Sequence, residues 1–407
     1  MASNISRPSA LLSWLIDIRR DLHRFPELAF NEHRTTRKIA RILESLGAQI
    51  IPFENCTGLA GLFTGPKEGP TIALRAEIDA LPIQELNKTS YTSENEGKMH
   101  ACGHEANTAV MLGVAKKMVA EGVINRMRGN VKLIFQPAEE QGLGAKVVIE
   151  KGVLEDPYVD RIFAGHMSPD LAVGQVGVFR SLGYASVDRF KLEVQGQGAH
   201  GARPEEGVDP IVAGAHFVSQ IQTIVARNVK PTHAAVVTIG SFLSGKAANV
   251  IPHTATLNGS IRAMTQQVRD LLLKRLEAMA IGLERTFQVS CQWSLEEGVP
   301  PIVCDTTTSE MLFQAAEKIA GKERVAYIEP IMGSDDFAFF TLERPASIIR
   351  LGCSNVDAGI IGRLHAPDFD IDEAVLEIGA DIFYEAVCAE VLPTLKRPAR
   401  LPSCSMP

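Results

Sequence analysis

The spacing of apolar and polar positions predicts a mixture of helices and strands along the chain. Near the N-terminus, residues 11–22 repeat apolar side chains at helical spacing, and a second helix is expected over residues 31–46. A third helix is expected over residues 108–119. Short apolar runs predict buried strands before and after it, at residues 71–76, 130–136 and 159–165. Helices that alternate with buried strands are typical of an α/β domain.

This pattern changes near residue 186 and returns after residue 300. The segment between them predicts an α+β module, with strands at 189–194, 234–239 and 255–262 and helices at 210–226 and 267–287. Beyond it we expect a helix, an apolar strand and a closing helix, at 308–320, 346–351 and 371–391. The chain therefore predicts one discontinuous domain, residues 1–185 and 298–407, and one inserted domain, residues 186–297. The length of 407 residues agrees, because single cores stop growing at about 250 to 300 residues.

Composition narrows the class of protein. Hydrophobic residues make up 45% of the chain and charged residues 22%, as in an ordinary globular protein. The 41 Lys and Arg residues against 48 Asp and Glu residues leave a net charge of −7, which argues against a nucleic-acid partner. The seven cysteines are scattered and odd in number, so we expect reduced thiols in the cytoplasm. Neither a signal peptide nor a membrane span is expected from the apolar runs.

Metal-binding side chains appear first around residue 102. Cys102 and His104 flank a glycine that lets the backbone bend, so a thiolate and an imidazole can face one divalent metal such as zinc or manganese. A Cys-x-His pair alone is as often accidental as functional. Glu77 and Asp79 follow the strand at 71–76, at the sheet edge where α/β proteins bind ligands, and they can orient a metal ligand. A solvated pair of loop carboxylates is the rival interpretation.

The next two strands also lead into polar side chains. Glu139 and Glu140 follow one of them, and because neighbouring side chains diverge, one can bind metal while the other handles a proton. An acidic helix start would look similar. His166 is expected at the carboxyl end of the following strand, and His365 could return to the site from the far end of the chain. Repetition of this arrangement favours a metal site along one sheet edge.

Three other polar residues give a weaker signal. His200 lies on a glycine-rich loop and Asn249 at the start of a short strand, and neither has an obvious metal partner. His23 ends the first helix, just before a proline. A structural histidine that caps carbonyls or packs is favoured there over a metal ligand, because no second ligand type lies nearby in the sequence.

Eight stretches of the chain, taken in order, resemble one known family. They are residues 22–27, 74–82, 99–104, 136–140, 196–209, 248–252, 333–337 and 364–365. The family is the aminoacylase and carboxypeptidase metallopeptidase family, in the branch of hippurate hydrolases, bacterial N-acyl-amino-acid amidohydrolases and plant auxin-conjugate hydrolases. The resemblance implies a zinc-peptidase-like α/β catalytic domain with a central mixed sheet. It also implies that the inserted α+β domain is a lid that mediates dimerisation.

The resemblance further implies roles for individual residues. Five positions match metal ligands: Cys102, His104, Glu140, His166 and His365. Glu139 matches the general base that accepts a proton from metal-activated water. His200 and Asn249 match lid residues that reach toward the substrate, and His200 would stabilise the negative charge that develops on it.

Several positions depart from the usual family pattern. Relatives usually read Cys-Gly-His-Asp-x-His, where this chain has Glu105 and Asn107, and they usually have Asp where this chain has Glu77. Asp79 and Glu105 are expected behind the metal ligands, and Asn107 beside the substrate. We therefore expect one or two ions of Mn or Zn, and Glu105 and Asn107 favour one. The lid also has Glu205 where relatives usually have His.

Three functions agree with these features. The leading one is metal-dependent hydrolysis of the amide C–N bond in a small N-acyl amino acid or a related conjugate. A second enzyme is a hydrolytic deaminase of an aromatic amine, such as an aminobenzoate or a nitroanthranilate. The third, from another class, is a catalytically silent protein that binds small molecules. A homodimer formed through the inserted domain is expected, with no nucleic-acid or membrane partner.

Overall fold

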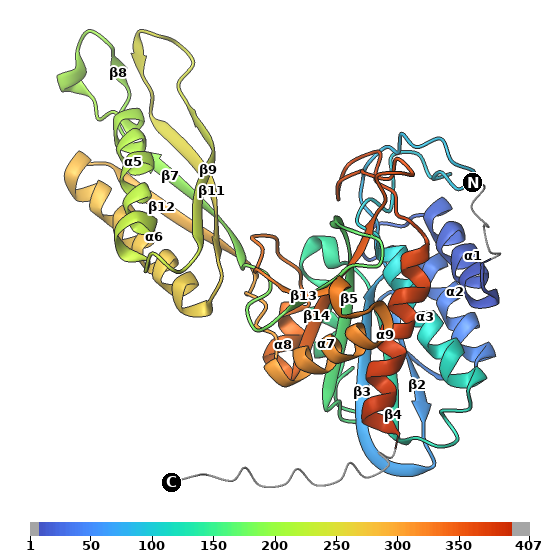
Figure 1. Ribbon diagram of the computed structural model, residues 1–407. Coiled ribbons are helices and arrows are strands. Elements are labelled where there is room, and N and C mark those ends of the chain that lie inside the picture. The colour runs from blue at the N-terminus through green and yellow to red at the C-terminus, as the bar shows by residue number, and fades with distance from the viewer. Residues whose placement is uncertain (1–7, 393–407) are drawn as a thin grey trace, which may run out of the picture. The chain divides into compact units, whose positions relative to one another are not determined.

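The structure is a computed structural model that describes residues 8–392 (Figure 1). Contacts between Cα atoms divide the chain into two compact units, each assembled from separate stretches of sequence. Among the described residues, the first unit draws on 8–178, Thr307–Ala326 and 344–392, and the second on Phe179–Thr306 and Tyr327–Glu343. The boundaries expected from the sequence, after residues 185 and 297, stay a prediction.

The larger sheet has eight strands. Their order across the sheet is β1 (Gln49–Pro52), β2 (Leu59–Thr64), β4 (Arg128–Gln136), β3 (Lys67–Glu77), β5 (Arg161–Ala172), β14 (Ala346–Ser354), β6 (Val176–Phe179) and β13 (Val325–Ile328). The central pairs β4–β3, β3–β5 and β5–β14 are parallel, whereas β1–β2, β2–β4 and β14–β6 are antiparallel. Parallel strands buried on both faces need continuous apolar runs, which these strands have. The expected α/β fold with a central mixed sheet is confirmed.

One helix of the first unit is buried along most of its length. α3 (His104–Ala120) packs against α1 (Ala10–Arg24), α9 (Ala374–Val391) and β3 (Figure 1). Gly113 permits the close approach, because a Cβ there would lie 2.9 Å from the Cβ of Ala380. The other helical segments are α2 (His33–Ser45), η1 (Glu139–Gln141), α4 (Gly144–Glu150), α7 (Thr306–Ala320) and η3 (Lys322–Arg324).

The second unit contains a four-stranded antiparallel sheet. Its order is β12 (Ser290–Val299), β7 (Val187–Gln195), β11 (Thr254–Ala263) and β9 (Ala235–Ser244). Along β7, buried and more exposed positions alternate, so one face of the sheet is available for a core. The remaining elements are β8 (Ala199–His200), η2 (Pro204–Glu206), α5 (Pro210–Asn228), β10 (Val250–Ile251), α6 (Gln266–Phe287) and α8 (Ala338–Glu343).

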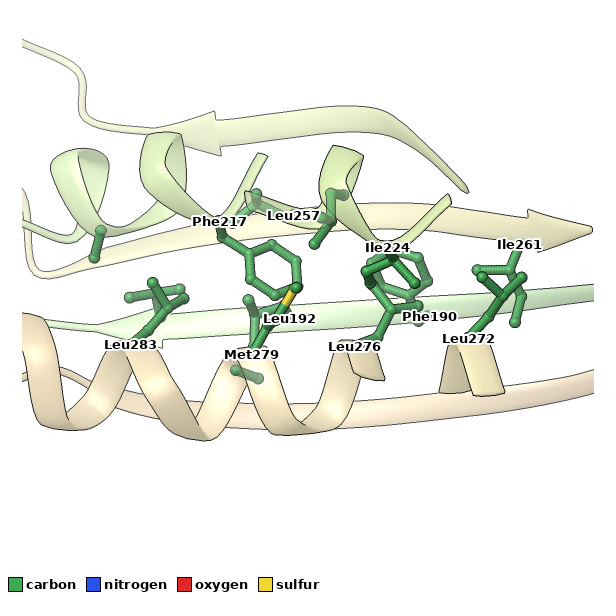
Figure 2. Close-up of a cluster of buried hydrophobic side chains, with 14 of the residues drawn as sticks. Phe190, Leu192, Phe217, Ile224, Leu257, Ile261, Leu272, Leu276, Met279 and Leu283 are labelled. Carbon is green, nitrogen blue, oxygen red and sulfur yellow. The ribbon is translucent and has the colours of Figure 1, made fainter. Parts of the chain in front are cut away.

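Side chains of α5 and α6 fill the core of this second unit. Figure 2 shows Phe217 of α5, Leu192 of β7 and Met279 of α6 together in this core. All three are buried. Removal of these apolar side chains from water is the main contribution to the stability of such a core. Asp209 caps α5 by accepting a hydrogen bond from the backbone N–H of Ile211, 2.8 Å away.

Most predicted helices and strands are present within a few residues of their expected positions, but several details differ. α3 begins at His104 rather than at residue 108, because the left-handed Gly103 starts the helix there. β5 continues to Ala172, so His166 lies inside a strand and not at its end. Pairing with β14 extends β5. Elements that were not expected from the sequence are the strands β1, β2, β6, β12 and β13 and the helices α4 and α8. Within residues 8–392, no helix is long and apolar enough to cross a membrane.

Candidate metal centre

A tight bend places Cys102 and His104 on the same site. Gly103 between them has a φ of 85°, which L side chains rarely adopt, and a Cβ there would lie 2.9 Å from Cγ of Met167. His104 is the first residue of α3, and Cys102 precedes the helix by two positions. The glycine therefore lets the thiol and the imidazole project from one turn.

The first unit brings together all five residues that were expected as metal ligands. Sγ of Cys102 lies 3.5 Å from Nε2 of His166 and 3.3 Å from Nε2 of His365. Nε2 of His365 lies 3.5 Å from Oε1 of Glu140. Two groups of three ligand atoms, each within 4.8 Å of one another, share the thiol: Cys102 with His104 and His166, and Cys102 with Glu140 and His365.

The far end of the chain reaches this site through a backbone contact. The backbone N–H of His365 donates to the carbonyl oxygen of Ala101 over 2.7 Å. His365 itself has a left-handed backbone, with a φ of 64°, which is rare for a residue other than glycine. The contact and this conformation together hold the imidazole beside Cys102, although 263 residues separate the two.

The two adjacent glutamates of η1 both face the ligand group. Oε2 of Glu139 lies 3.8 Å from Nε2 of His104, and Oε1 of Glu140 lies 4.0 Å from the same nitrogen. The preceding Ala138 is left-handed, with a φ of 54°, and its N–H donates to the buried carboxylate of Glu32 over 2.9 Å. Burial raises the pKa of Glu32 to about 7. The turn that aims both glutamates is thus fixed from behind, by a residue that sequence reasoning missed.

Asp79 contacts two of the candidate ligands. Nδ1 of His104 lies 2.9 Å from the carbonyl oxygen of Asp79 and 3.2 Å from its Oδ1. Its other carboxylate oxygen accepts a hydrogen bond from the backbone N–H of Glu140 over 2.9 Å. With Nδ1 of His104 engaged, Nε2 is the nitrogen left to face the ligand group.

The chemistry of these groups fits a divalent cation. Nε2 of His104 and Oε1 of Glu140 are buried without a hydrogen-bond partner, which is costly unless another group binds them. Burial raises the pKa of the Cys102 thiol well above its usual range, and it also raises the pKa of the Glu140 carboxyl. A divalent cation favours the deprotonated forms of both groups, so the sulfur, nitrogen and oxygen donors fit a bound metal ion.

Two departures from the family pattern contact each other. Nδ2 of Asn107 donates to Oε2 of Glu77 over 3.0 Å, and both side chains are buried. Arg75 forms an ion pair with the other oxygen of Glu77. The substrate contact expected of Asn107 stays a prediction. Arg75 was not anticipated, because a charged residue within an apolar strand carries no signal of its partner.

The third departure, Glu105, lies in a buried group of charges. Its Oε1 accepts a hydrogen bond from Nε of Arg19 over 3.0 Å and lies 2.8 Å from Nδ1 of His23. The structural role expected of His23 is therefore met by packing among carboxylates, because its two ring nitrogens face Glu105 and Glu85. A signal for Arg19 did exist, since it lies on the same face of α1 as the buried Leu15 and Leu22.

His200 and Asn249 lie next to each other in the second unit. His200 pairs with Val250 across β8 and β10, and the backbone N–H of Gly201 donates to the carbonyl oxygen of Asn249 over 2.8 Å. Both residues are exposed. His200 also lines a cavity of about 730 Å³ in this unit, with Leu243 and His253 among the other lining residues.

Comparison with known proteins identifies the family. The model of peptidase family M20/M25/M40 matches residues 73–389. The chain is 38% identical over 384 residues to N-acetyl-L-cysteine deacetylase of Bacillus subtilis (strain 168), which covers 94% of this chain and 90% of that protein. It is 33% identical to IAA-amino acid hydrolase ILR1-like 4 of Arabidopsis thaliana, over 93% of this chain and 86% of that protein. The crystal structure of Bacillus subtilis YXEP, described as a dinuclear metal binding peptidase from the M20 family, superposes with a TM-score of 0.82 at 33% identity, over 94% of this chain and 99% of that chain.

The chain therefore belongs to peptidase family M20/M25/M40. It is a metal-dependent amidohydrolase, and the resemblance and the enzyme class expected from its sequence are confirmed. The comparisons favour neither the deaminase nor the catalytically silent binding protein.

Proposed function

We propose that this enzyme hydrolyses the amide bond of N-acyl amino acids or similar small conjugates. The observation that supports this most directly is the position of Glu139, whose carboxylate lies 3.8 Å from His104 without belonging to the five candidate ligands. A protein that only binds a metal has no need of this additional carboxylate. Relatives named for N-acetylcysteine and for conjugates of auxin with amino acids support the substrate class.

Cys102, His104, Glu140, His166 and His365 would hold the metal, which we propose to be Mn or Zn. When bound, it polarises the substrate carbonyl and lowers the pKa of water. Two overlapping groups of ligands support two ions, as does the dinuclear relative. If the protein retains only one equivalent of metal after dialysis, this would instead support the expectation of one ion, which was drawn from Glu105 and Asn107.

Glu139 would act as general base and then as general acid. Its carboxylate accepts the proton of the attacking water and later donates it to the departing nitrogen. Asp79 keeps His104 oriented through Nδ1. Contacts of His200 and Asn249 with the substrate are proposed from the resemblance alone.

We also propose a cytoplasmic homodimer formed through the inserted domain. The described cysteines are free thiols, which supports a reducing compartment. Size-exclusion chromatography with light scattering tests the dimer, since a monomer at micromolar concentration would contradict it.

The substrate class can be tested with a panel of compounds. Protein loaded with Mn or Zn is incubated with N-acetyl, N-benzoyl and indole-acetyl amino acids, and free amino acid is measured by mass spectrometry. Release of the amino acid supports the proposal. Release of ammonia from an aminobenzoate, with every amide left intact, would support the deaminase instead.

A further inference from the structure

A buried arginine lies behind the candidate metal centre and has no part in the mechanism above. Arg19, on α1, has an exposed fraction of 0%. Its guanidinium contacts three carboxylates: Nε lies 3.0 Å from Glu105, one terminal nitrogen 2.8 Å from Asp370, and the other 3.4 Å from Glu373. A guanidinium presents its donors in a rigid plane, so it fixes the relative positions of the groups that it binds.

Two of these carboxylates belong to the segments that carry candidate metal ligands. Glu105 directly follows His104 and is three residues from Cys102. Asp370 is five residues beyond His365 and accepts a hydrogen bond from the backbone N–H of Ile371 over 2.9 Å. One side chain from the first helix therefore joins two segments that are far apart in the sequence, and both lead into the metal site.

His23 continues the same group of contacts one helical turn away. Its Nδ1 lies 2.8 Å from Oε1 of Glu105, and its Nε2 lies 3.2 Å from Oε1 of Glu85. The other oxygen of Glu85 accepts the backbone N–H of Ser93 over 2.6 Å. His23 thus ties the loop that contains Glu85 to the start of α3.

Tyr91 of that loop closes the group against Asp370. Its hydroxyl donates to Oδ2 of Asp370 over 2.7 Å, and its ring lies 4.8 Å from the Arg19 guanidinium carbon. Asp370 is therefore held on both oxygens, by Arg19 and by Tyr91. The segment that leads to His365 is fixed without any contact made by the imidazole itself.

We propose that Arg19 is a positioning residue for the metal centre. It holds the Cys102–His104 segment through Glu105 and the His365 segment through Asp370. This inference rests on the proposed metal ligands. Residues behind a metal site typically change metal affinity by about 10- to 100-fold when they are replaced, because the ligands lose their preset orientation.

The test uses Co²⁺ in place of the native metal. A thiolate bound to Co²⁺ gives a charge-transfer absorption band that depends on the coordination geometry, so Cys102 reports on the site without any assay of activity. In the wild-type protein this band is expected on loading with Co²⁺. Arg19→Met should shift or weaken the band and speed the release of Co²⁺ to a chelator by about 10-fold or more.

Arg24→Gln is the matched control. Arg24 also lies on α1, but its guanidinium is partly exposed and pairs with the partly exposed Glu94. Its band and release rate should equal those of the wild type. Arg19→Lys should have a band and a release rate between those of the wild type and Arg19→Met. The ammonium keeps the positive charge but cannot reproduce the planar, forked donors of the guanidinium.

Each outcome decides the inference. If Arg19→Met does not fold, the band and the rate of Co²⁺ release are measured on Glu105→Gln instead. This variant keeps the shape of the side chain but weakens the contact with Arg19. A folded Arg19→Met or Glu105→Gln protein with the wild-type band and release rate would overturn the positioning role and leave the proposed centre intact. Absence of a thiolate band in the wild type would overturn the proposed centre and the inference together.

Discussion

Both units of the enzyme have an apolar core, but more of the buried charged side chains lie in the first unit than in the second. The first encloses charged groups around the candidate metal centre, among them Arg19, Glu77 and Glu105. The second closes α5 and α6 over its sheet with an apolar core. Burial of charge costs free energy unless each group is paired, whereas burial of apolar surface is favourable by itself. Charged residues of the first unit should therefore affect the metal and turnover, and apolar residues of the second should affect stability.

The largest expected effect on turnover belongs to Glu139→Gln. The amide keeps the shape of the side chain but cannot accept a proton, so turnover of an N-acyl amino acid should fall by roughly 100- to 10,000-fold. Metal content, measured by elemental analysis, should stay unchanged, since Glu139 is not among the five candidate ligands. Glu150→Gln, at the exposed end of α4, is the control and should keep full activity. Full activity in Glu139→Gln would remove it from the role of base.

In the second unit, Phe217→Ala should lower the stability of the protein, whereas Glu139→Gln in the first unit should lower turnover. Phe217 is fully buried in the apolar core, so its truncation removes a large contact area and leaves a cavity. We expect the free energy of unfolding to fall by about 3 to 5 kcal/mol, measured by circular dichroism in denaturant. Ile281→Ala, at a half-exposed position of α6, should change it much less. Equal losses in the two variants would contradict the packing shown in Figure 2.

A smaller effect is expected from Asp79→Asn. The amide keeps the size of the side chain but weakens the contact with Nδ1 of His104, so metal affinity should fall by about 10- to 100-fold in competition with a chelator. Asp160→Asn is the control, because Asp160 also accepts a hydrogen bond from a backbone N–H, that of Thr71 in the middle of β3. Equal metal affinities in the two variants would show that Asp79 does not orient the ligand.

Several candidate residues of this centre could be found from the sequence because their signals are local. Apolar runs fix β3 and β4, and the carboxylates that follow such strands lie at one sheet edge. His166 was misplaced at a strand end, because the pairing that extends β5 comes from β14, about 180 residues later in the chain. The pairing of β5 with β3, in contrast, ends at Ala164. His166 therefore lies two residues beyond the part of β5 that pairs with β3.

Contacts between distant side chains were beyond prediction for a related reason. Arg19 and Glu105 are 86 residues apart, and Asn107 and Glu77 are 30 apart. Hydrophobic periodicity says which face of a helix is buried but not which charge meets which. The sequence singled out Glu105 and Asn107 as unusual, but it did not show their partners. Glu105 contacts Arg19 and His23, and Asn107 contacts Glu77.

The smallest effect is expected where an ion pair of the second unit lies in water. Arg189 and Glu296 approach to 3.0 Å across β7 and β12, but both side chains are 70% exposed. Solvent screens such a pair, so Arg189→Gln should change the free energy of unfolding by less than about 1 kcal/mol. Arg269→Gln should cost more, because Arg269 binds the buried Asp188 through two nitrogens. Denaturant unfolding that gave equal losses for both would mean that burial does not set the value of a charge in this unit.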